Sequence, residues 1–193
     1  ITLSLASLSR QRITIHPKKE TRFLLLIIKE VLDHAATVDE AIAIFMKYNV
    51  IDNGSDILSH HILIAGPEGR SVILEPVDGV LKTIPSRSQW QVISNQIQYQ
   101  RKPSSIGREC WRYEKLHERF SQETAGNKAE GLDIRAAMQL LKDVAQINVR
   151  YVFESGPQII STQWSTLFDL NRKTIYMALH RNFERIIRLK FIK

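Results

Sequence analysis

The chain has a single cysteine, Cys110, in the segment ECWRYEKL at residues 109–116. On a helix, Glu114 and His117 would follow it at the i+4 and i+7 positions and share its face. A nucleophilic cysteine needs its sulfur within hydrogen-bond reach of the imidazole, whereas two helical turns separate the α-carbons by about 10 Å. The carboxylate between them would also raise the pKa of the thiol. We therefore predict that Cys110 is a packed side chain without a catalytic role.

Two other groups of residues have types that could carry chemistry. His60 and His61 are adjacent in an apolar segment that is typical of a β-strand, and neighbouring strand residues point to opposite faces, so they cannot easily share one metal ion. A catalytic triad could be assembled from Ser165, Asp169 and His180, but no nucleophile-elbow glycines flank the serine. No glycine-rich phosphate loop follows an expected strand. The sequence therefore favours neither group, and no cofactor or metal is expected.

A basic stripe occurs between residues 108 and 119, formed at helical spacing by Arg108, Arg112, Lys115 and Arg119. It could be a solvated helix face, or an anion or nucleic-acid site in which nearby aromatic rings stack on bases. Three glutamates in the same segment dilute the positive field. The net charge of +7 is otherwise spread along the chain. A basic binding module therefore remains an alternative, although no nucleic-acid partner is expected.

Asn95 ends the apolar segment WQVISN, which the pattern predicts to be a strand. Asparagine is unfavourable inside strands, so its position at an end is common for a turn residue. A side-chain amide at a strand end can also donate to the oxyanion that forms when a carbonyl is attacked. Spacing alone leaves both interpretations open.

The composition indicates an ordinary globular protein. The 193 residues are 44% hydrophobic and 24% charged, which suffices for one domain with a sizeable core. The densest apolar run, residues 23–28, is much shorter than the roughly 18 residues that a membrane helix needs. One cysteine cannot form an internal disulfide, which agrees with a reducing, cytoplasmic location. We expect no membrane partner.

Periodicity predicts an α+β fold with helices grouped between antiparallel strands. Thr37 and Glu40 form a capping-box pattern that starts the second of two helices within residues 21–48. Further helices are expected within 108–120 and 132–147. Strands are expected at 1–9, 60–66, 70–76, 80–84, 90–95, 161–170, 173–179 and 184–192. Loops are expected at 9–20, 96–107 and 121–131.

Taken in order, five segments resemble the choloylglycine hydrolase-like linear amide C–N hydrolases, which belong to the N-terminal-nucleophile (Ntn) superfamily with penicillin V acylases and bile salt hydrolases. The segments are TVDEAI, SHHILIAGPEGRSVILEP, WQVISN, CWRYEKL and TQWSTLFDLNRKTIYMAL. The resemblance runs from about Ile1 to Leu189. It implies a four-layer αββα sandwich, incomplete at its N-terminus, formed by residues 1–193 as a single domain.

The resemblance also implies a mechanism. In this family the thiol of an N-terminal cysteine attacks a linear amide, its own α-amine acts as the base, and an acyl-enzyme forms and is hydrolysed. By position, Asn95 matches the asparagine that helps to form the oxyanion hole. Arg112 matches an arginine that supports the active site, where a permanently protonated guanidinium can stabilise negative charge. The implied partner is a small-molecule amide substrate, and a homo-oligomer is compatible with the family.

Several departures limit what the chain could do alone. Ile1 is not a cysteine, and the family's N-x-x-G-L motif would lie upstream of it. Residues 64–69 are IAGPEG where relatives commonly have IADxxG. We therefore expect the nucleophile upstream of Ile1 and no amide hydrolysis by these 193 residues by themselves. The alternatives are a non-catalytic remnant or fragment of the same fold, or a basic anion- or nucleic-acid-binding module.

Overall fold

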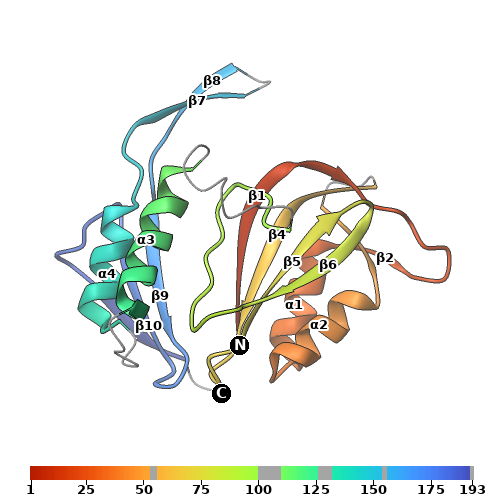
Figure 1. Ribbon diagram of the computed structural model, residues 1–193, viewed down its shortest axis with the longest axis horizontal. Helices are drawn as coiled ribbons and strands as arrows, with labels where there is room; N and C mark the ends of the chain where they lie inside the picture. Colours follow the sequence, from red (N-terminus) through yellow and green to blue (C-terminus); the bar gives the residue numbers. More distant parts are fainter. Residues whose placement is uncertain (53–55, 100–109, 126–131, 154–155, 192–193) are drawn as a thin grey trace. The chain divides into compact units, whose positions relative to one another are not determined.

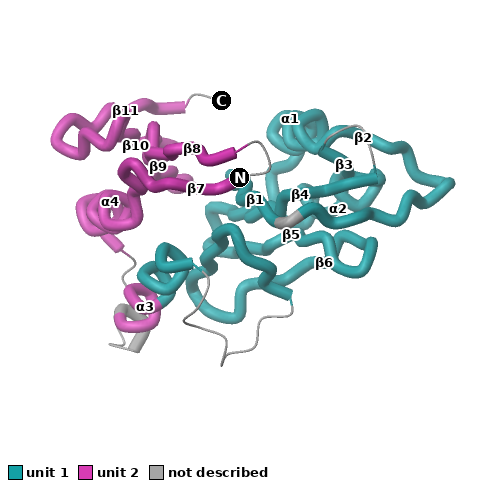
Figure 2. The backbone as a smooth tube through the Cα atoms, turned by 90° about the horizontal axis from the view of Figure 1, so that it is seen from above, with its two compact units in different colours: residues 1–117 teal, residues 118–193 magenta. Residues whose placement is uncertain are grey.

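The computed structural model describes residues 1–52, 56–99, 110–125, 132–153 and 156–191. It divides the chain into two compact units, residues 1–117 and 118–193, each of which is described by itself (Figure 2). The elements are β-strands and α-helices in both units, which confirms the predicted α+β class. No helix within these described ranges has both the length and the hydrophobicity needed to cross a membrane.

The first unit is built on an antiparallel sheet with the strand order β1-β4-β5-β6. Its strands are β1 (Thr2–Arg12), β4 (Ile57–Ala65), β5 (Ser71–Val77) and β6 (Val80–Pro85). Tight turns join the last three strands, as predicted. They place Gly69 at φ 79° and Asp78 and Gly79 at φ 51° and 80°, values that glycine and aspartate tolerate.

Two helices, α1 (Leu24–His34) and α2 (Val38–Met46), cover one face of this sheet (Figure 1). The face of α1 formed by Leu24, Ile27 and Val31 is fully or almost fully buried. It packs with α2 against the inward residues of β4 and β5 in one apolar core. The predicted capping box is confirmed, since Thr37 Oγ1 accepts from the Glu40 amide at 3.2 Å while the Glu40 carboxylate accepts from the Thr37 amide at 3.1 Å.

Two boundaries in the first unit differ from the prediction. β1 continues to Arg12, because beyond a break in register Gln11 and Arg12 pair again with β4. Residues 21–23 are not helical but form β2 (Thr21–Phe23), which runs parallel to β3 (Asn49–Ile51). The buried Asn49 side chain explains this: its Nδ2 donates to the carbonyls of His16 and Lys19 at 3.0 Å each and holds the incoming chain extended.

The expected strand at 90–95 is absent from the structure, which places these residues in an irregular segment. Side chains, rather than a strand ladder, satisfy its backbone. Ser86 Oγ and Ser88 Oγ both donate to the Trp90 carbonyl, at 2.9 and 2.7 Å. The carbonyl of Ser94 accepts from a histidine, as described below. Asn95 therefore lies in a loop that specific side chains anchor.

The second unit has a three-stranded antiparallel sheet, β11-β10-β9, and a separate hairpin. Its strands are β7 (Val149–Phe153), β8 (Gly156–Ile160), β9 (Trp164–Asp169), β10 (Thr174–Leu179) and β11 (Ile187–Lys190). Helix α4 (Ile134–Asp143) packs on β9, and Asp133 caps it by accepting from the Ala136 amide at 2.7 Å. The β7–β8 hairpin extends away from the three-stranded sheet (Figure 1) and was not predicted.

Helix α3 (Trp111–Ala125) passes from the first unit into the second. The prediction ended this helix at residue 120 and placed a loop from residue 121, which is wrong as far as residue 125. No glycine or proline interrupts the helix before Gly126, and Gln122 donates one turn back to Glu118 at 3.3 Å. Residues 108, 109 and 126–131, which these predictions also included, lie outside the described part of the chain.

Candidate active site

The two residues that the sequence singled out, Asn95 and Arg112, are brought together. Arg112 Nη2 donates to Asn95 Oδ1 at 2.5 Å, from the second residue of α3 to the irregular segment. This contact fixes which end of the amide is the oxygen, because a guanidinium can only donate. Asn95 Nδ2 in turn donates to the backbone carbonyl of Ser7 in β1 at 3.0 Å. The amide group is therefore oriented from both ends.

A buried polar pair fixes the backbone on both sides of Asn95. His61 in β4 and Glu75 in β5 are cross-strand neighbours with fully buried side chains, and His61 Nδ1 lies 3.0 Å from Glu75 Oε2. His61 Nε2 lies 2.6 Å from the carbonyl oxygen of Ser94. The Glu75 carboxylate accepts from the backbone amides of Gln98 and Tyr99, each at 2.8 Å at its shortest.

The hydrogen placement in this network follows from its acceptors. A backbone carbonyl can only accept, so His61 Nε2 must carry a hydrogen. The Nδ1–Glu75 bond then shares one further proton between ring and carboxylate. Buried polar groups of this kind are stable only when all of their hydrogen bonds are made. Strand β4 and strand β5 thereby clamp both ends of the segment that carries Asn95.

Sequence reasoning missed the role of this pair, although the pattern contained the information. Glu75 is a carboxylate inside the apolar run SVILEPV, which is unusual for an exposed strand face. The tight turn sets the register, in which Ala65 pairs with Ser71. Counting back along the hairpin from this pair places His61 opposite Glu75, so the contact could have been inferred from the turn.

Cys110 lies half-buried immediately before α3, where its carbonyl accepts from the Glu114 amide at 3.2 Å. Partial burial raises the pKa of its thiol, but the backbone amide of Tyr113, the side chain of Ser94 and the charge of Arg112 together hold that pKa below its usual range. The predicted increase in this pKa from Glu114 is therefore wrong. The N-terminus of a helix and an arginine act more strongly on the thiol than that carboxylate does.

A pocket of about 700 Å³ lies beside this segment within the first unit. Aliphatic and polar side chains of β5, β6 and residues 86–98 form much of its wall, and Trp90, Tyr99, Tyr113 and His117 give it one aromatic side. The His117 ring packs edge-on against Trp90, with centroids 5.0 Å apart, and stacks on Tyr113 at 5.8 Å. Such a wall suits the apolar part of a small molecule.

The residues of the possible Ser165 triad are not assembled into a site. Ser165 and Asp169 lie at opposite ends of β9, and the Asp169 carboxylate is bound by the amide and guanidinium of Arg172, at 2.9 and 3.1 Å. The burial of Ser165 at 8% exposure also makes it a poor nucleophile for a substrate. Within the described ranges, no group of three or more His, Cys, Asp or Glu side chains is arranged to hold a metal ion.

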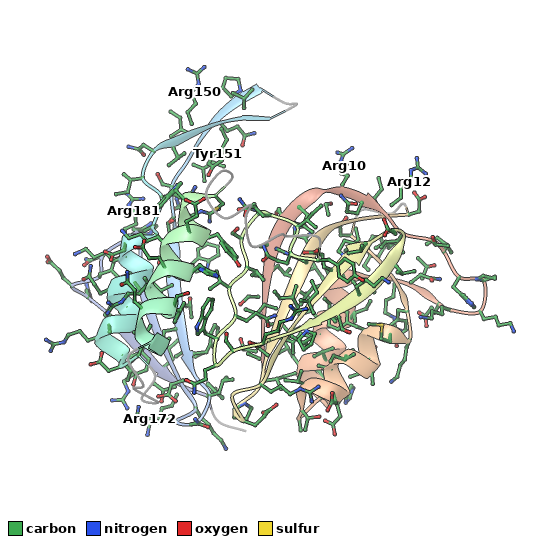
Figure 3. All side chains as sticks on the ribbon, in the orientation of Figure 1. Arg10, Arg12, Arg150, Tyr151, Arg172 and Arg181 are labelled. Carbon is green, nitrogen blue, oxygen red and sulfur yellow. The ribbon has the colours of Figure 1, made fainter. Side chains whose placement is uncertain are left out.

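The predicted basic stripe on α3 lies only partly within the described residues. Arg112 is directed to Asn95, and Arg108 lies outside the described residues. In the first unit, Arg10 and Arg12 point outward from β1, where Arg12 pairs with Asp56 at 3.0 Å (Figure 3). In the second unit, Arg150 lies on the β7–β8 hairpin (Figure 3).

Sequence comparisons find no match for this chain among family profiles or curated proteins. Comparison of structures does find matches. A mutant of the conjugated bile acid hydrolase from Clostridium perfringens has a TM-score of 0.72 and 12% identity, over 97% of this chain and 69% of that protein. A second variant of the same hydrolase has a TM-score of 0.71, also at 12% identity. Penicillin V acylase from Agrobacterium tumefaciens has a TM-score of 0.67 and 20% identity, over 92% of this chain and 59% of that protein.

These neighbours belong to the group that the sequence motifs indicated. At identities of 12 to 20%, the similarity establishes the fold and not the reaction. The predicted resemblance is therefore confirmed at the level of structure: the chain has the fold of the choloylglycine hydrolase-like members of the Ntn superfamily.

Proposed function

We propose that this chain forms the oxyanion-binding part of a hydrolase that cleaves a linear amide C–N bond. In this proposal the nucleophile is an N-terminal cysteine thiol upstream of Ile1, and the complete domain is a four-layer αββα sandwich. The structural neighbours are amide hydrolases, which supports the class of reaction. The observation that carries the proposal is the 2.5 Å contact between Arg112 and Asn95 within that fold.

The contact gives the amide of Asn95 a defined chemical role. Because Arg112 occupies the amide oxygen, the Nδ2 group must point the other way. Among the described residues, one of its two hydrogens is used, on the Ser7 carbonyl. The second hydrogen can donate to an oxyanion as a thiolate attacks the amide carbonyl. A donor held in place before the reaction stabilises this charge without reorganisation, which is why such groups contribute strongly to catalysis.

The implied substrate is a small molecule with an apolar acyl or leaving group. The pocket that Trp90, Tyr99 and Tyr113 help to line would accept such a group within the same unit as Asn95. A homo-oligomer, which is compatible with the family that the motifs resemble, is also proposed. Sedimentation equilibrium of the purified chain tests this assembly state.

The test of the proposed reaction uses a longer form of the protein that begins with the upstream cysteine. Its activity is assayed on a panel of linear amides that includes acyl amino acids and penicillin V. We expect Asn95→Ala to lower kcat by about 10²–10³-fold, the usual effect of removing one oxyanion donor. Asn171→Ala, in an exposed turn of the second unit, is the matched control and should leave kcat unchanged.

Two results would count against the proposal. The longer form could be folded yet inert on every amide, which would support a non-catalytic remnant of the same fold. Alternatively, it could be active while Asn95→Ala retains full kcat, which would remove Asn95 from the oxyanion site. Arg112→Lys separates orientation from charge, because lysine keeps the charge but not the planar donor pair.

A further inference from the structure

A second group of polar side chains lies in the first unit and is not used by the proposed function. Ser7 Oγ is 3.3 Å from His60 Nε2, and His60 Nδ1 is 2.8 Å from Asp52 Oδ2. Ser7 lies in β1 and His60 in β4, and Asp52 directly follows β3. This is the connectivity of a nucleophile, a base and an orienting carboxylate, with each histidine nitrogen facing the correct partner.

The surroundings of Asp52 determine which nitrogen of His60 carries the proton. The Asp52 side chain is only 9% exposed and accepts from the Ser59 amide at 2.6 Å and from Ser59 Oγ at 3.0 Å. A carboxylate that accepts these bonds also accepts from His60 Nδ1–H. Nε2 of a neutral ring is then left with a lone pair directed at the Ser7 hydroxyl, which is the tautomer that a general base requires.

Ser7 is exposed, and its position in β1 is unusual. The pairing of β1 with β4 follows one register up to Ser7↔His60 and resumes in another at Gln11↔Leu58. Such bulges re-aim side chains and are over-represented next to active sites.

We propose that Ser7, His60 and Asp52 form a second nucleophilic site, which takes acyl groups from small carboxylic esters. Ser7 Oγ attacks the ester carbonyl while His60 Nε2 takes its proton. The tetrahedral intermediate collapses, the C–O bond to the alcohol breaks, and His60 returns the proton to the departing alcohol. Water then attacks the acyl-serine with His60 as base, which releases the acid and regenerates the hydroxyl.

Esters fit this site better than amides. Ser7 is exposed, so the leaving group departs into solvent and the reaction favours a group that departs easily. An alcohol does so more readily than an amine. The site also needs no residue upstream of Ile1, so it is independent of the amide-hydrolase proposal.

The test is labelling of the 193-residue chain with a fluorophosphonate that carries a fluorescent reporter. The Ser7 oxygen forms a bond to phosphorus, the P–F bond breaks, and fluoride leaves as His60 takes the proton. Fragmentation mass spectrometry of the peptide 1–10 identifies the modified serine. p-Nitrophenyl acetate, which reports acyl transfer directly, should release p-nitrophenolate with turnover that Ser7→Ala abolishes.

We expect labelling at Ser7, lost in Ser7→Ala and slowed about 100-fold in His60→Gln, the range for loss of a general base. Ser4→Ala is the matched control, because Ser4 is exposed in the same strand but faces Leu63. In wild-type chain unfolded in urea, Ser7 is present but no longer lies beside His60. Its labelling rate should therefore equal that of the folded His60→Gln variant. Equal labelling of folded and unfolded chain, or of wild type and His60→Gln, would overturn the proposal.

Discussion

His60 and His61 are neighbours in β4, but they lie on opposite faces of the sheet and in opposite environments. His61 is fully buried, and both of its ring nitrogens are held by Glu75 and the Ser94 carbonyl. The His60 side chain is 31% exposed and lies between a nearly buried carboxylate and an exposed hydroxyl. The same residue type, one position apart, is thus part of a closed network on one face and an open one on the other.

The difference shows how burial assigns different roles to the same side chain. A closed network leaves no atom for a substrate, so the histidine can only position other groups, here the segment that carries Asn95. An open network leaves a hydroxyl in reach of solvent, where a proton transfer can be completed with an incoming molecule. One face of β4 therefore carries a histidine that positions other groups, and the other face carries a histidine that could react. Substitutions on the two faces should have different consequences.

The largest effect is expected on stability. His61→Ala leaves the Glu75 carboxylate buried without its partner, which typically costs about 3–5 kcal/mol. His60→Ala should cost no more than about 1 kcal/mol, because the pair is partly exposed and Asp52 keeps its bonds from Ser59. Urea unfolding followed by circular dichroism measures both. Equal losses in the two variants would mean that the faces do not differ as the structure shows.

The alternation of these two histidines was predictable, but their partners were only partly so. The hairpin of β4 and β5 and the capping box at Thr37 follow from local patterns, because turn glycines and capping residues act within a few positions. The pairing of Arg112 with Asn95 followed only from family resemblance. The partners Ser7 and Asp52 were missed, since a register break in β1 and the end of β3 depend on packing that no local pattern encodes.

Long-range contacts also explain why the prediction for residues 90–95 was wrong. Its apolar alternation predicts a strand, but the structure leaves it irregular because Ser88 and His61 bind its carbonyls at residues 90 and 94. A side-chain bond from 33 positions away competes with a strand ladder only once the sheet has formed. The residue most relevant to the proposed function, Asn95, thus lies where sequence periodicity was misleading.

A smaller effect is expected on local backbone opening. In Glu75→Gln, the amides of Gln98 and Tyr99 lose a charged acceptor, and hydrogen bonds to charged groups contribute about 1.5–3 kcal/mol. Their hydrogen exchange should accelerate by roughly 10–100-fold relative to the amide of Val31 in the core, which corrects for global unfolding. NMR measures this exchange residue by residue.

The matched change on the other face is Asp52→Asn. It removes the charged acceptor of the Ser59 amide, so exchange at Ser59 should accelerate while Gln98 and Tyr99 keep their wild-type ratio to Val31. If Asp52→Asn also accelerates exchange at Gln98 and Tyr99, the two networks are coupled through β4. The two faces of the strand would then not act independently.

The smallest effect is expected at Cys110, whose thiol reports on the His61 face. The side chain of Ser94 and the charge of Arg112 lower the pKa of this thiol, so alkylation by iodoacetamide should reach its half-maximal rate at a lower pH in the folded chain than in urea. Ser94→Ala and Arg112→Gln each remove a group that favours the thiolate, so each should move that midpoint to higher pH. Ser59→Ala removes a hydrogen bond to Asp52 and none of the groups that act on the thiol, so it should not move the midpoint. If Ser59→Ala shifts the midpoint as far as Ser94→Ala does, the pKa of the thiol depends on groups beyond those that contact it. The network around residues 94–99 would then not be independent of the network around Asp52.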